Sequence, residues 1–192
     1  MSNCKLTAKK QKGFTLLELV VAVSLGATLF AVLGNAMIGT TRSVDYIVTD
    51  MVTVQDLRDG VTGIGGELRR SAATSITIVS GSQNDTLTLQ VSAANGSGST
   101  MGAEDQSGNF NTGWSIRYRV VGTDLIREVL NAGGLPASSH IIARHVSDQG
   151  GVKGLAVTQN GALYTVRIQI NTEFDDGNDY TKDMQSTVFV RN

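Results

Sequence analysis

The sequence has one cysteine, one proline and few aromatic residues, which make up 5% of its 192 residues. Cys4 has no second cysteine with which to form a disulfide, and no Cys/His spacing typical of a metal site occurs. Because the proline is Pro136, no proline interrupts a long helix early in the chain. We therefore expect a domain that is held together by burial of apolar side chains, without disulfides.

Charged residues are absent from Leu19 to Thr41, where most side chains are apolar. This run exceeds the ~20 residues that a helix needs to cross the hydrocarbon core of a bilayer. It is also longer than the hydrophobic region of a cleaved secretory signal, which has about 7–15 residues. Residues 1–13 contain four lysines and no acidic residue. This charge bias predicts a single membrane span with its N-terminus in the cytoplasm.

One carboxylate, Glu18, lies inside the apolar segment that begins at Phe14. An acidic side chain costs roughly 2.5–3.5 kcal/mol at the centre of a membrane helix and less near the interface. A plain membrane anchor gives no reason to keep such a residue. We therefore expect Glu18 to have a partner.

The stretch Lys12-Gly13-Phe14-Thr15-Leu16-Leu17-Glu18 resembles the cleavage and methylation motif of type IV prepilins and pseudopilins. The resemblance implies that a membrane prepilin peptidase cleaves between Gly13 and Phe14, and that the new Phe14 amine is N-methylated. It also implies that Glu18 pairs with the N-terminal amine of an adjacent subunit during filament assembly. One helical turn separates Glu18 from the new terminus, so the two charges lie on roughly the same side of the helix.

Many major pilins have a proline in the middle of this helix, where the present chain has Asn35. The difference favours a minor pilin or pseudopilin over an abundant shaft subunit, and it leaves open a kink at Gly34-Asn35. The C-terminal part looks like W-type minor pilins and J-type minor pseudopilins. This looser resemblance is carried by residues 114–120, 125–128, 152–155 and 164–168.

Beyond the apolar run, apolar residues recur at helical spacing: Val44, Ile47, Met51, Val54, Leu57, Val61, Ile64 and Leu68. We predict one helix from Phe14 to about Ala72. A break near Gly60–Gly66 stays open, because glycines weaken a helix. The predicted parts are a leader (1–13), a transmembrane and filament-core helix (14–41), an amphipathic helix (42–72) and a β-rich exported domain (73–192).

The remaining chain reads as strands separated by turns, which gives an α+β fold with the helix packed on a mainly antiparallel sheet. Residues 93–112 are rich in Gly, Ser and Asn and are predicted as a loop. The expected strands are 75–79, 86–91, 114–121, 124–130, 141–146, 152–158, 163–170 and 184–190.

Residue sets for catalysis are not found, so we expect no enzyme. His140 and His145 have no metal-site pattern around them and are predicted to be core or surface residues. The segment from Glu173 to Asp183 is rich in oxygen donors that suit Ca²⁺. Its spacing does not match an EF-hand loop, so a solvated acidic loop is favoured over a calcium site and no cofactor is expected. The candidate calcium ligands are Asp175, Asp176, Asn178 and Asp179.

Without the four leader lysines, 12 basic side chains face 17 acidic ones, which argues against a nucleic-acid partner. The pairs Arg69-Arg70 and Arg117/Arg119 are predicted to be solvated.

The sequence thus predicts a minor pilin-like subunit of a type IV pilus that primes assembly or lies at the tip. Expected partners are other pilin subunits, the prepilin peptidase and the inner-membrane assembly platform. The expected location is the inner membrane, with the C-terminal domain periplasmic, and later a filament. The alternatives are a minor pseudopilin of a type II secretion system and a membrane-anchored adhesin that binds through the loops 93–113 and 171–183.

Overall fold

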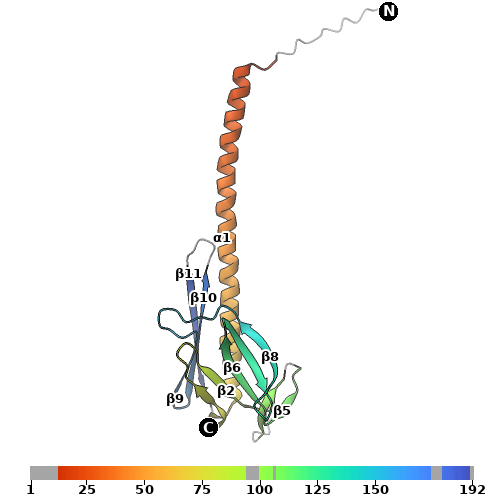
Figure 1. The fold of residues 1–192 in the computed structure, drawn as a ribbon, viewed down its shortest axis with the longest axis vertical. Coiled ribbons are helices and arrows are strands. Elements are labelled where there is room, and N and C mark those ends of the chain that lie inside the picture. Colours follow the sequence, from red (N-terminus) through yellow and green to blue (C-terminus); the bar gives the residue numbers. More distant parts are fainter. Residues whose placement is uncertain (1–12, 94–99, 106, 174–178, 191–192) are drawn as a thin grey trace, which may run out of the picture. The chain divides into compact units, whose positions relative to one another are not determined.

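The computed structural model describes residues 13–93, 100–105, 107–173 and 179–190. The chain divides into two compact units, residues 1–49 and 50–192, and each is described by itself. The first unit contains the N-terminal part of the helix α1 (Leu16–Arg70), and the second contains the rest of α1 and antiparallel sheets. The predicted α+β fold, with a long apolar N-terminal helix packed on antiparallel sheets, is confirmed (Figure 1).

Helix α1 is continuous from Leu16 to Arg70. The helix therefore has neither of the interruptions left open by the sequence, at Gly34-Asn35 or at Gly60–Gly66. Gly60 has a packing role, since a Cβ atom placed there would lie 2.8 Å from Ile168 Cδ1. Glycine lets the helix approach the sheet closely at this point.

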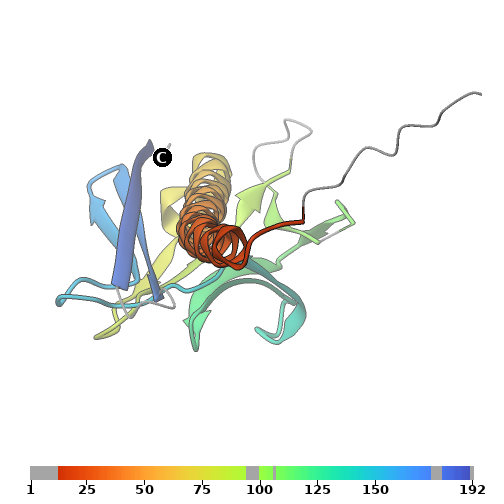
Figure 2. The same ribbon diagram turned by 90° about the horizontal axis from the view of Figure 1, so that it is seen from above.

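The described residues of the second unit form three sheets, whose strands lie on different sides of the helix segment 50–70 (Figure 2). The five-stranded sheet has the order β1-β2-β6-β7-β8 and the other two are three-stranded, β11-β10-β9 and β3-β4-β5. The first sheet comprises β1 (Thr77–Val79), β2 (Thr86–Leu89), β6 (Ser115–Val121), β7 (Asp124–Leu130) and β8 (Pro136–Ala143). The second comprises β9 (Leu155–Asn160), β10 (Leu163–Glu173) and β11 (Asp179–Phe189), and the third β3 (Val91–Ser92), β4 (Met101–Glu104) and β5 (Phe110–Thr112). A short 3₁₀-helix, η1 (Ala73–Ser75), follows α1.

The core of the second unit is built around one face of α1. Leu57, Val61, Ile64 and Leu68 from the predicted apolar stripe are all buried. They belong to one cluster with buried strand residues, which include Tyr118, Leu125, Tyr164 and Ile168. The start of the stripe differs, because Val44, Ile47 and Met51 are exposed. The helical period was therefore predicted correctly, but only the second half of the apolar stripe is buried against other parts of the chain.

One predicted loop contains strands, and the bounds of several predicted strands differ from the structure, with β9 beginning three residues later and β11 five residues earlier than predicted. The segment 101–112 contains β4 and β5 where a loop was predicted, and Gly102 shows why. A Cβ atom at this glycine would come within 2.3 Å of the Asn111 carbonyl oxygen, so the residue that signalled a loop is one that the strand pairing requires.

The edge strand β8 begins at Pro136, although the strand was predicted from Ile141. An edge position tolerates a proline because its missing N–H is not needed for pairing on the outer side.

Candidate assembly site

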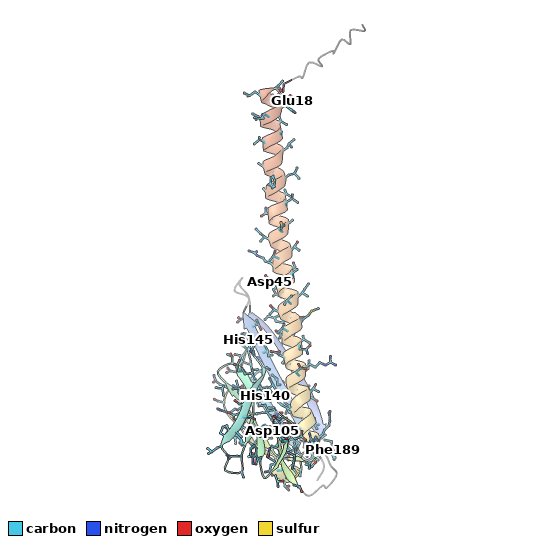
Figure 3. The ribbon with its side chains drawn as sticks, turned by 90° about the vertical axis from the view of Figure 1, so that its right-hand side faces the viewer. Glu18, Asp45, Asp105, His140, His145 and Phe189 are labelled. Atoms are coloured by element: carbon cyan, nitrogen blue, oxygen red, sulfur yellow. The ribbon has the colours of Figure 1, made fainter. Side chains whose placement is uncertain are left out.

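Helix α1 begins with reciprocal hydrogen bonds between Thr15 and Glu18. The Thr15 backbone N–H donates to Glu18 Oε2 at 2.9 Å, and the Glu18 backbone N–H donates to Thr15 Oγ1 at 3.3 Å. The Thr15 hydroxyl also donates to Glu18 Oε2 at 3.1 Å. This is a capping box, which satisfies N–H groups that the first turn of a helix otherwise leaves unpaired. Figure 3 shows Glu18 at this end of α1.

Glu18 was predicted to have a partner in another subunit, and its partner within its own chain, Thr15, was missed. The signal was present, since a threonine followed three residues later by a glutamate before an apolar run is typical of a capping box. Glu18 therefore has a local structural role in the single chain. Its pairing with another subunit stays a prediction.

The predicted cleavage bond between Gly13 and Phe14 lies before the first helical residue. Both residues are exposed, and apart from the chain neighbours no described residue has an atom within 4 Å of the position that a Gly13 side chain would occupy. The described part of the chain thus leaves this bond open to another molecule. The predicted leader residues 1–12 lie outside the described residues.

The surface of the first unit is apolar along most of the helix. Large side chains such as Phe14 and Phe30 are 88% and 79% exposed, and Glu18 is the sole charged residue between Phe14 and Thr41. This N-terminal apolar helix is long and apolar enough to cross a membrane and fits single-pass membrane anchoring.

Five hydroxyl groups along this helix donate hydrogen bonds to the helix's own backbone. These O–H groups donate to carbonyl oxygens about one turn earlier, with oxygen–oxygen distances of 2.9–3.2 Å. The donors are Ser24, Thr28, Thr40, Thr41 and Ser43. Such bonds lower the cost of placing a hydroxyl where water is absent.

At its C-terminal end α1 is joined to the sheets by ion pairs. Arg127 of β7 pairs with Glu67 at 2.8 Å, and the Tyr118 hydroxyl donates to Glu67 Oε2 at 2.6 Å. One turn later, Arg70 pairs with Glu104 of β4 at 2.6 Å. Burial raises the pKa of Tyr118 well above its usual value, and the charge of Glu67 adds to this. The hydrogen bond from Arg70 holds the pKa of Glu104 below its usual range.

Two other carboxylates of the second unit have cationic partners. Glu128 is buried and accepts bonds from both Arg117 and Arg119, at 2.7 and 2.8 Å. Arg69 is exposed, as predicted, whereas Arg70, Arg117 and Arg119 are partly exposed and ion-paired, so the prediction of simply solvated side chains was wrong for these three. The buried carboxylate of Asp85 binds Lys153 at 2.5 Å and the backbone N–H of Val157 at 2.8 Å. These contacts outweigh the effect of burial, so the pKa of Asp85 is lowered.

The remaining sequence candidates do not form a site among the described residues. His140 lies half-buried in β8 and His145 is exposed after it (Figure 3). Asp179 is exposed at the start of β11, while Asp175, Asp176 and Asn178 lie outside the described residues. Within the described chain no group of three His, Cys, Asp or Glu side chains could hold a metal ion.

Comparison with known proteins identifies the N-terminal segment. Residues 8–34 match the family model of the prokaryotic N-terminal methylation motif. Neither a curated protein nor a solved structure gives a match to this chain. The match spans Gly13, Phe14, Glu18 and most of the exposed apolar helix. The motif supports a type IV pilin-like or pseudopilin-like protein.

Proposed function

We propose that the chain is a minor pilin-like subunit of a type IV pilus that primes assembly or lies at the filament tip. In this proposal a prepilin peptidase cleaves between Gly13 and Phe14, and the Phe14 amine is then methylated. The N-terminus faces the cytoplasm before cleavage, and the second unit lies on the other side of the inner membrane. Assembly then moves the apolar helix from the lipid into a filament of similar helices.

The observation that carries the proposal is the single carboxylate at the start of an otherwise uncharged, exposed apolar helix. Such a surface needs lipid or other apolar helices around it. In either setting a carboxylate is costly unless it meets a cation. A neighbouring subunit's Phe14 amine would supply that cation, and methylation leaves this amine charged.

The capping box positions the Glu18 carboxylate in the proposed pairing. Glu18 Oε2 accepts both bonds from Thr15, so the free chain holds the carboxylate against its own first turn. A carboxylate has about four lone-pair sites, and two bonds leave room for a further donor. Glu18 can therefore accept a bond from a neighbour's amine while it still caps its own helix.

Mass spectrometry of the mature N-terminus tests the processing step. The expected N-terminal residue is N-methylated Phe14. A mature protein that retains residues 1–13, or that begins elsewhere, would contradict the proposal. Gly13→Val is the matched variant, since a branched side chain at the cleavage position is expected to block cleavage and to leave the second unit folded.

Glu18→Ala tests the assembly step. The variant is expected to be inserted and cleaved but to be lost from sheared filaments, with a reduction of tenfold or more. Asp45→Ala is the control, since it also removes an exposed carboxylate from α1 outside the apolar run. A Glu18→Ala protein that still enters filaments would contradict the assembly role of Glu18. A wild-type protein that is absent from filaments, together with a Glu18→Ala protein that keeps its function, would point to the adhesin alternative, in which the helix is only an anchor.

The same processing would serve a minor pseudopilin of a type II secretion system, so the choice between the two machines needs a separate experiment. Deletion of the gene is expected to reduce surface pili and leave secretion of folded periplasmic proteins unchanged. The opposite pattern would favour the pseudopilin. The genes beside this one offer an independent check, since they would encode components of one machine or the other.

A further inference from the structure

The outer face of the sheet β11-β10-β9 carries a groove of about 310 Å³ that the filament proposal does not use. Its floor is formed by side chains that alternate with the core residues of the strands, and one wall by the segment before β9. The lining residues are Gly151, Val152, Lys153, Ala156, Thr158, Thr165, Arg167 and Gln185. Two of them are cations and none is an acid.

Arg167 is the central residue of this groove. It lies in β10 between the buried Val166 and Ile168, and it is paired in register with Ala156 and Gln185 of the flanking strands. Its Nε atom is buried, and no hydrogen-bond acceptor for it is found among the described residues. Other arginines of the second unit, such as Arg117, Arg119 and Arg127, have carboxylate partners.

The other cation of the groove is already neutralised. Lys153 binds Asp85 at 2.5 Å and also donates to the Ser80 hydroxyl at 2.7 Å. Arg167 makes no ion pair with any described residue, so its charge is uncompensated in the groove. Because Nε is buried, a ligand in the groove would meet the terminal nitrogens of the guanidinium, where an anion forms charge-assisted hydrogen bonds.

The groove also offers neutral polar groups. The Thr165 hydroxyl is hydrogen-bonded to that of Thr187 at 3.0 Å, and the Thr158 hydroxyl and the Gln185 amide lie on the neighbouring strands. These groups suit the hydroxyls of a polar ligand. The guanidinium suits a carboxylate, which it can bind through two parallel N–H bonds.

We propose that the Arg167 groove binds a small polar carboxylate, of the size and chemistry of a uronic acid. The carboxylate would accept bonds from Arg167, and the ligand hydroxyls would meet Thr158, Thr165 and Gln185. The volume is at the lower end of the range of small-ligand sites, about 300–1,000 Å³. This proposal is independent of the filament role, since it concerns only the second unit.

Calorimetric titration of the full-length protein in detergent, at constant ionic strength, tests the proposal. The probes are galacturonate, neutral galactose and sodium sulfate. Galacturonate is expected to bind at least tenfold more tightly than galactose, which has similar hydroxyls but no carboxylate. Equal binding of the two sugars would overturn the proposal, as would tighter binding of sulfate than of galacturonate or a wild-type protein that galacturonate does not saturate.

Variants place the binding at Arg167. Arg167→Gln is expected to weaken galacturonate binding at least tenfold. Arg167→Lys is expected to weaken it less, because lysine keeps the positive charge but lacks the planar pair of N–H donors. Arg144→Gln is the control, since it removes an exposed arginine outside the groove. If Arg144→Gln and Arg167→Gln weaken galacturonate binding equally, the effect comes from net charge alone, and the proposed site at Arg167 is contradicted. Thermal unfolding of each variant without ligand separates loss of folding from loss of binding. Thr158→Val removes a hydroxyl group from the groove and is expected to weaken galacturonate binding severalfold.

Discussion

The Nη2 atom of Arg127 lies 2.8 Å from Oε1 of Glu67, and this ion pair joins the last turns of α1 to the strand β7. The two side chains are only 11% and 18% exposed. Arg127 also donates to the Glu104 carbonyl oxygen at 3.2 Å, so a single guanidinium contacts both α1 and strand β4 of the sheet β3-β4-β5.

Replacement of Arg127 by methionine is expected to destabilise the second unit by about 3 kcal/mol, because Glu67 is left partly buried without its cation. Urea unfolding followed through the fluorescence of Trp114, the sole tryptophan, measures this loss. Arg144→Met is the control, since Arg144 is exposed and has no ion pair within the described chain. Similar losses in the two variants would show that the Glu67 pair contributes nothing specific.

Two glycines of α1 give a matched pair of variants. Gly63 is exposed with open space around it, so Gly63→Ala is expected to stabilise the helix by up to ~1 kcal/mol. At Gly60 the added methyl group would meet the buried Ile168, and overpacking costs about 1–3 kcal/mol. Gly60→Ala is therefore expected to unfold at lower urea concentration than Gly63→Ala. An equal gain in both would mean that the helix does not pack on β10 as described.

His140 is expected to make the stability of the second unit depend on pH near neutrality. Burial, and then the positive charge of Arg127, lower the pKa of His140 in the folded state. Below about pH 6.5, the usual histidine value, the unfolded chain takes up a proton that the folded protein resists. Stability should therefore fall as pH drops from 7 toward 5.5, by less than about 1.4 kcal/mol per pH unit for one proton.

Unfolding midpoints measured across this range test the histidine prediction. His140→Leu should remove the slope, whereas His145→Asn, which replaces the exposed histidine, should keep it. The lowered pKa values of Asp85, Glu104 and Glu128 act in a different range. Their contribution is complete above the usual carboxyl pKa, about 4, and is lost as pH falls through the lower folded values. A slope that persists in His140→Leu would contradict the assignment.

Thr15→Ala is expected to weaken the first turn of α1 by about 1 kcal/mol, because the backbone N–H of Glu18 loses its acceptor. Hydrogen exchange of the first-turn amides in detergent should become severalfold faster. Thr15→Ser keeps the hydroxyl and should preserve protection. Unchanged exchange in Thr15→Ala would show that the capping box does not hold in the membrane-like environment.

The helix and its covered face could be predicted because both depend on local spacing. The steps between Leu57, Val61, Ile64 and Leu68 follow the helical period, and all four side chains are buried. Glu18 was found for a similar reason, since a lone carboxylate in an apolar run is visible in the sequence. The processing roles of Gly13 and Phe14 stay predictions, because they depend on other proteins.

What could not be predicted depends on contacts between distant residues. Arg127 and Glu67 are far apart in the sequence, and nothing local to either indicates the other. Gly102 misled the strand assignment because glycine marks both loops and sites where backbones approach closely. The groove at Arg167 was missed because its lining residues are distant in the sequence: they come from three strands and from the segment before β9.

The ion pairs along α1 have a mechanical consequence. Asp50 contacts Lys182 and Tyr180 of β11, and Glu67 and Arg70 are held by Arg127 and Glu104 roughly 25–30 Å farther along the axis. A pull along the helix would load these pairs and the buried side chains between them in parallel, as a shear force. To extract the helix, the load must break them together, whereas a sideways peel would break them one at a time. The domain is thus built to resist tension applied through its own N-terminal helix.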